Sequence, residues 1–88
     1  MVAAHLRLTP KELSERTGIQ FEISQDGFDY MEAALIQSVS GRQFGLFRYQ
    51  HSPIQRYTAL VIQEGTENLT EALNDALQSL SIDTSEVI

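Results

Sequence analysis

Residues 28–39, Phe-Asp-Tyr-Met-Glu-Ala-Ala-Leu-Ile-Gln-Ser-Val, decide the fold because they suit two different structures. A helix here would collect the large apolar residues on one side, at Phe28, Met31, Leu35 and Val39. Methionine, glutamate and alanine also favour a helix. A strand here would run from Met31 to Ser38 and end in a turn at Ser40 and Gly41. The local sequence alone leaves both structures open.

The residues that follow favour the strand. Residues 42–49 alternate between two sides, with Arg42, Phe44, Leu46 and Arg48 on one and Phe47 and Tyr49 on the other. Residues 51–53, His-Ser-Pro, break this run because proline cannot continue a ladder. Residues 56–63 are rich in strand formers. A strand at 31–38 would continue into these two through short turns, so we predict an antiparallel meander. The helical alternative gives three helices and a three-stranded sheet.

Before this region, a short helix is predicted from Pro10 to Thr17. Thr9 and Glu12 have the spacing of a capping box, and Gly18 suits the left-handed residue that ends a helix. Residues 19–23 alternate like a half-buried strand, and residues 25–27, Gln-Asp-Gly, indicate a turn.

An amphipathic helix is predicted after residue 68, where Asn68 can cap it. Its apolar residues recur at helical spacing, at Leu69, Ala72, Leu73, Ala76, Leu77 and Leu80. We expect Leu69, Leu73, Leu77 and Leu80 to be buried. Residues 81–88 suit either a short turn or a loose end.

These elements predict a single α+β domain over residues 1–88. Its two layers would be a four-stranded antiparallel meander and helices, with the C-terminal helix packed on one sheet face. The other face or an edge strand would then need cover, so we expect a homodimer.

Composition narrows the functional classes. The 88-residue chain has no cysteine, which favours a reducing compartment, and we expect a cytoplasmic protein without a signal peptide or membrane span. Its net charge of −6 makes binding to nucleic acid phosphates unlikely. The charges are segregated, because residues 33–63 contain no acid and residues 64–88 contain no base.

The basic hairpin between residues 42 and 57 is the candidate partner-binding site. It interleaves arginines with aromatic residues, both of which are favoured as anchors of protein interfaces. The candidate residues are Arg42, Arg48, Tyr49, His51, Arg56 and Tyr57. The alternative is a small nucleic-acid-associated regulator that stacks bases on the same hairpin.

Motifs for catalysis are missing from the sequence. His5 and His51 are the only histidines and cysteine is absent, so no zinc ligand set is indicated. The serines lie in no nucleophile-elbow pattern, and the glycines form no phosphate-binding loop. We therefore expect no catalytic, metal or cofactor residues and no enzymatic activity.

Residues 8–19, Leu-Thr-Pro-Lys-Glu-Leu-Ser-Glu-Arg-Thr-Gly-Ile, resemble the first helix and turn of bacterial helix-turn-helix proteins. That resemblance implies a recognition helix at residues 20–27. This segment instead alternates like a strand and carries two acids, where a helix lying along phosphates would carry bases. The expected function is therefore a non-catalytic accessory or regulatory protein that acts through protein–protein contact as a homodimer.

Overall fold

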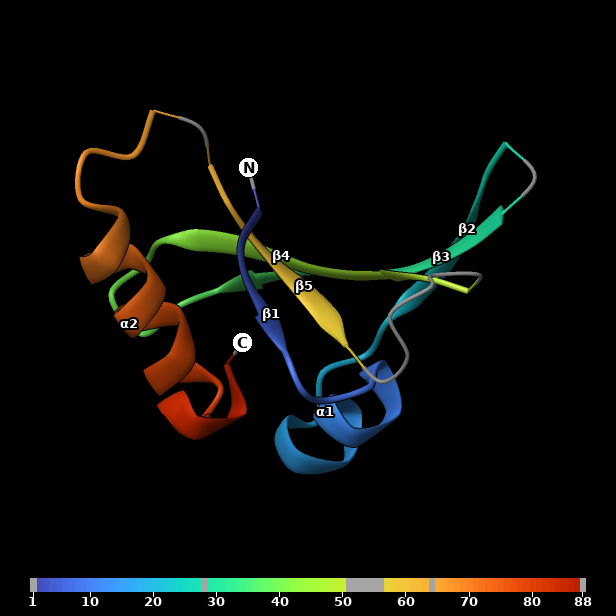
Figure 1. Ribbon diagram of the computed structural model, residues 1–88, viewed down its shortest axis with the longest axis horizontal. Helices are drawn as coiled ribbons and strands as arrows, with labels where there is room; N and C mark the ends of the chain where they lie inside the picture. Colours follow the sequence, from blue (N-terminus) through green and yellow to red (C-terminus); the bar gives the residue numbers. More distant parts are fainter. Residues whose placement is uncertain (1, 28, 51–56, 64, 88) are drawn as a thin grey trace.

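The protein folds into one antiparallel five-stranded sheet with helices packed against it (Figure 1). The computed structural model describes residues 2–27, 29–50, 57–63 and 65–87. Along the chain the elements are β1 (Val2–Leu6), α1 (Pro10–Thr17), β2 (Glu22–Asp26), β3 (Asp29–Gln37), β4 (Gln43–Tyr49), β5 (Thr58–Ile62), α2 (Leu69–Ser79) and the 3-10 helix η1 (Thr84–Glu86). The α+β class predicted from the sequence is confirmed.

The deciding segment is a strand, β3, as predicted. It pairs with β2 on one side and with β4 on the other. The ladders on both sides satisfy its backbone groups, and this tertiary pairing outweighs the helix propensity of its Met, Glu and Ala residues. The helical alternative for residues 28–39 is wrong.

The predicted sheet was one strand short. The strand order is β1-β5-β4-β3-β2, so β2 to β5 follow one another and β1 adds to the free side of β5. No strand was predicted for Val2–Leu6, because its residues, Val-Ala-Ala-His-Leu, do not alternate between apolar and polar. The strand expected at residues 19–23 lies three residues later, at Glu22–Asp26.

Local capping determines α1, whose predicted bounds are confirmed. Thr9 Oγ1 accepts a hydrogen bond from Glu12 N at 3.1 Å, and Glu12 Oε1 accepts one from Thr9 N at 3.3 Å. Gly18 has a φ of 77°, which glycine adopts without steric cost, and its N–H donates to the carbonyl of Ser14.

The hydrophobic core lies on one face of the sheet, between the sheet and both helices. Alternate residues of the central strands point into it, together with residues of α1, α2 and the segment after α2. Its buried members are Leu6, Leu8, Leu13, Phe44, Leu46, Leu60, Ile62, Ala72, Ala76, Leu77, Leu80 and Ile82. Because both helices contribute to this one cluster, they share a face of the sheet.

The stripe of α2 is only partly as predicted. Leu77 and Leu80 are buried, Leu73 is half-buried, and Leu69 is 41% exposed. Leu69 is the first residue of α2 and precedes the first buried residue, Ala72, by almost a turn. Periodicity identified the correct side of the helix but not how far along its axis the sheet extends.

The C-terminal segment is a turn packed on the fold. Val87 forms a bridge to Leu6, and Arg16 Nη2 lies 2.8 Å from Glu86 Oε1. None of the helices in the described part of the chain has the length and apolar character needed to cross a membrane.

Candidate interaction surface

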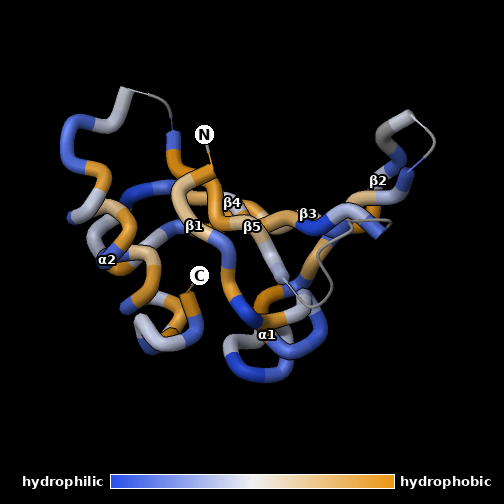
Figure 2. Tube along the Cα trace, in the orientation of Figure 1, coloured by the Kyte–Doolittle hydropathy of each residue, from blue (hydrophilic) through white to orange (hydrophobic). Residues whose placement is uncertain are grey.

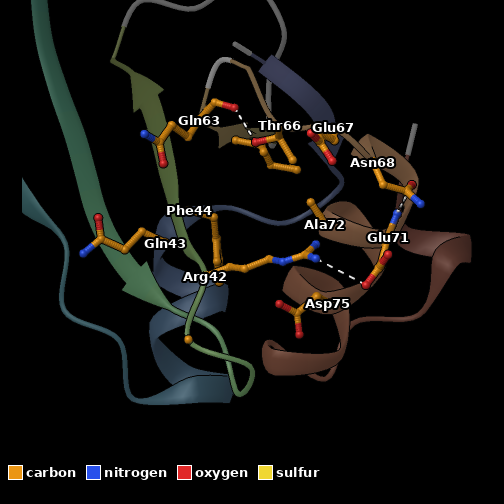
Figure 3. Close-up of a pocket in the computed structure, with 12 residues that line it drawn as sticks. Arg42, Gln43, Phe44, Gln63, Thr66, Glu67, Asn68, Glu71, Ala72 and Asp75 are labelled. Atoms are coloured by element: carbon orange, nitrogen blue, oxygen red, sulfur yellow. Dashed lines mark hydrogen bonds and ion pairs between the residues drawn. The ribbon is translucent and has the colours of Figure 1, made fainter.

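The structure separates the residues of the predicted basic site. Arg42 precedes β4 and its Nη2 lies 3.2 Å from Glu71 Oε1 on α2 (Figure 3). Both side chains are exposed, so the ion pair itself adds little stability. It nevertheless directs the Arg42 guanidinium toward the acidic helix.

Arg48 and Tyr49 point to opposite faces of the sheet. Arg48 is the cross-strand partner of Glu32 on the helix-bearing face, and its Nη1 donates to the Tyr57 carbonyl at 2.6 Å. Tyr49 is paired with Met31 on the other face, where Tyr57 lines the same hollow. His51 and Arg56 lie outside the described residues. The structure therefore brings Arg48, Tyr49 and Tyr57 together around one hollow, although Arg48 and Tyr49 belong to opposite faces of the sheet. Arg42 lies apart from them, beside α2.

A different surface stands out, which we call the open sheet face. It is the sheet face opposite the core, and the strand registers arrange its side chains in rows that cross the strands. The first row is Leu35, Gly45, Val61 and Val2, and the second row is Ala33, Phe47, Ala59 and His5. Two outer rows flank these. Gln37 and Gln43 lie beside the first row, and Met31 and Tyr49 lie beside the second row. No helix or strand within the described ranges covers this face.

The four rows of the open sheet face are mostly apolar and contain no Asp, Glu, Lys or Arg. Leu35 is 75% exposed and Val2 is 46% exposed. Phe47 and Tyr49 form an edge-to-face pair with ring centroids 5.7 Å apart. Figure 2 shows apolar residues concentrated along the middle of the sheet. Acids lie at its border: Glu22 on β2 stands opposite Ala33 on β3, and Asp29 begins β3.

The surface is hollow at its centre because several of its residues are small. The hollow is lined by Met31, Ala33, Leu35, Gly45, Phe47 and Val61, together with polar residues of β2. Alanine at position 33 and glycine at position 45 leave space between the larger side chains of Leu35, Phe47 and Val61. The sequence led us to expect that the second sheet face or an edge strand needs cover, but it did not identify these residues.

A second cluster, which no pattern in the sequence indicated, joins the β3–β4 turn to α2. Ser38 Oγ donates to Asp75 Oδ2 at 2.6 Å, and Ser40 Oγ donates to the same oxygen. Ser38 Oγ also accepts from Arg42 N at 3.0 Å. The hydrogen bonds from Ser38 and Ser40 lower the pKa of Asp75.

The chemistry of this serine–aspartate joint is structural. Both hydroxyl protons are directed at Asp75, and no histidine takes part in the hydrogen bonds of the joint. A serine nucleophile needs a base that accepts its proton and is oriented by a third group. A carboxylate with a lowered pKa is a weak base for that task. The joint instead anchors the turn, where Val39 N also donates to Ser79 Oγ at 3.1 Å.

Across the described ranges, no three histidine or acidic side chains are grouped closely enough to hold a metal ion. Comparisons of the chain with protein-family models, with curated proteins and with solved structures found no match.

Proposed function

We propose that this chain is a non-catalytic accessory or regulatory protein that acts through protein–protein contact, and that it forms a homodimer through the open sheet face. One observation carries the proposal: the rows of the open sheet face contain no Asp, Glu, Lys or Arg and present Leu35 at 75% exposure. A sheet with one face packed on helices and an apolar second face leaves that second face to be buried by another layer. The absence of cysteine supports a reducing compartment, as in the cytoplasm.

A second copy of the chain suits this face better than a charged partner does. The net charge of the chain is −6, yet its acids lie outside the rows of the open sheet face. Two copies can therefore bring these faces together without opposing like charges at the centre. A basic partner would find its charge complement on α2, where Glu71 and Asp75 lie, and not on the open sheet face.

The size of the face sets the expected affinity. Four strands at about 4.8 Å and rows about 6.8 Å apart give roughly 400–600 Å² of sheet per copy. This lies at the low end for specific complexes, which bury about 800 Å² per partner. We therefore expect a dimer with a dissociation constant of roughly micromolar size.

Sedimentation equilibrium tests the proposal. The wild-type chain should reach twice its monomer mass between roughly 10 µM and roughly 1 mM. Leu35→Lys should weaken the dimer by roughly tenfold or more, because it would bury an unpaired ammonium. Val39→Lys is the matched control, since Val39 is 87% exposed and lies in the β3–β4 turn outside the open sheet face. A wild-type monomer at millimolar concentration, or equal weakening by both variants, would refute the proposal.

A further inference from the structure

The open sheet face has a size pattern that is complementary to itself. On β3, Leu35 of the first row is large and Ala33 of the second is small. On β4 the order is reversed, with Gly45 in the first row and Phe47 in the second. On β5 the order is again that of β3, with the larger Val61 in the first row and the smaller Ala59 in the second. Large and small side chains thus alternate in both directions across the three central strands.

We propose that two copies pack face to face about a two-fold axis that lies between the two sheets. The axis runs perpendicular to the strands and passes between the first and second rows. This inference rests on the proposed homodimer and specifies its geometry. Each strand then lies over its own copy running in the opposite direction. Leu35 covers Ala33 of the second copy, and Phe47 fills the space over Gly45. Val61 lies over Ala59, which is only 7% exposed within its own chain. Facing layers that place large residues over small ones pack without voids.

Gly45 is the strongest single indication of this geometry. Glycine in a strand interior is destabilising by roughly 0.5–1 kcal/mol relative to alanine. Within one chain, a Cβ at this position would lie 3.8 Å from Val61 Cβ and 3.9 Å from the Ala34 carbonyl oxygen, which are ordinary contacts. The fold of one chain therefore does not require glycine here. Glycine is required here if the Phe47 ring of a second copy packs over this position.

The outer rows agree with the same axis. It places the row of Gln37 and Gln43 over the row of Met31 and Tyr49 of the second copy. On β4 the Gln43 amide then comes against the Tyr49 hydroxyl, which can both donate and accept a hydrogen bond. Polar groups at the rim of the contact would be paired in this arrangement.

The competing symmetry places the axis along β4, so that each row lies over itself in reverse order. Leu35 would then oppose Val61, and Gly45 would oppose Gly45, which sets large against large and leaves a void at the centre. Overpacking and voids both cost stability in packed interiors. The size pattern therefore favours the axis that crosses the strands.

Sheet twist does not disturb the match at the centre. Aligned sheets pack at about −30°. At β3 and β5, about 4.8 Å from β4, this rotation displaces facing residues by roughly 2.4 Å, well below the row spacing of about 6.8 Å. At β1 and β2 the displacement doubles. The specific contacts should therefore be confined to β3, β4 and β5.

Cross-linking of single-cysteine variants tests the arrangement directly, because the chain has no cysteine of its own. Leu35→Cys protein is mixed with Ala33→Cys protein, or with Val61→Cys protein, and treated with a short bismaleimide above the dissociation constant. The proposed axis predicts that the 35–33 product exceeds the 35–61 product by roughly tenfold. Gln78→Cys, on the exposed side of α2, is the control that should form neither heterodimer product.

Each outcome is decisive. Dominance of the 35–61 product would overturn the proposed axis while leaving the homodimer standing. A wild-type chain that dimerises but yields neither product would also overturn the inference, since the contact would then lie elsewhere. A monomeric wild-type chain would instead refute the proposed function on which the inference rests.

A substitution at Gly45 gives an independent result with opposite signs for the two symmetries. A Cβ at position 45 makes only ordinary contacts, and valine favours a strand, so we expect Gly45→Val to keep the fold, which circular dichroism checks. With the proposed axis it should weaken the dimer by roughly tenfold, because the new side chain occupies the space for Phe47 of the second copy. Adding Phe47→Ala to that variant should recover part of the loss. With the axis along β4, Gly45→Val would fill the central void and tighten the dimer.

Discussion

Two leucines of α2 lie on the same side of the helix but differ in burial. Leu77 is 4% exposed, whereas Leu69 at the start of the helix is 41% exposed. Leu77→Ala would leave a cavity in the core and should reduce the free energy of unfolding by about 2–4 kcal/mol. Leu69→Ala, the matched control, should reduce it by less than about 1 kcal/mol. Urea denaturation measures both, and equal losses would contradict the packing of α2 described above.

Thr9 is a second residue whose contribution can be isolated. Its hydroxyl accepts from Glu12 N, and its own N–H is bound by the Glu12 carboxylate. Thr9→Ala should therefore cost about 1 kcal/mol of unfolding free energy. Thr70→Ala is a suitable comparison because Thr70 is exposed in the first turn of α2. If the two variants unfold at the same urea concentration, the capping box contributes nothing measurable.

The elements differ in how far the sequence could predict them. The bounds of α1 follow from Thr9, Glu12 and Gly18, which act within the segment itself. The strand β3 required the neighbouring segments, because its own residues suit a helix. For β1 the deciding interaction is with β5, far along the chain, and no local pattern reports it. Prediction therefore succeeded where the cause was local and failed where it was distant.

At the same scale, the joint between the β3–β4 turn and α2 should make stability depend on pH. The serine hydrogen bonds lower the pKa of Asp75 in the folded protein. Between this pKa and the unfolded value of about 3.9, the unfolded state binds more protons, so stability rises with pH. The contribution of Asp75 is complete above about pH 5 and is lost as pH falls through the folded pKa.

Comparison with Asp75→Asn measures this contribution. The difference in unfolding free energy between wild type and variant should be largest above about pH 5 and shrink toward about pH 2. Urea denaturation at a series of pH values provides the measurement. A difference that stays constant over this range would show that Asp75 is not coupled to Ser38 and Ser40 in solution.

For the whole molecule, dimerisation should couple stability to protein concentration. A dimer that dissociates on unfolding has a Tm that rises with concentration by mass action. Wild-type protein should therefore show a higher Tm at about 1 mM than at about 10 µM, whereas Leu35→Lys should show a smaller change. Differential scanning calorimetry over this range checks the expectation. A Tm independent of concentration in the wild type would contradict it.

The candidate site could be foreseen only in outline at this scale. The absence of acids from residue 33 to residue 63 drew attention to the arginines of the hairpin. Because neighbouring residues of a strand point to opposite faces, Arg48 and Tyr49 lie on opposite sides of the sheet. The register between β4 and β5 determines which small and large residues become neighbours. A single sequence shows alternation within each strand but not the register between strands. The alternation of Leu35, Gly45 and Val61 became visible only once the strands were aligned.

The position of β1 has a consequence for how the chain is made. β1 is translated before the other strands of the sheet, whereas its partner β5 is translated after all of them. Leu6, which is fully buried in the folded protein, cannot reach its place beside Thr58 until β5 has been translated. Closing so long a loop slows folding, and a nascent chain that ends before β5 leaves the free edge of β4 open to other chains. Within this sheet, the strand that is translated first is thus among the last to pair.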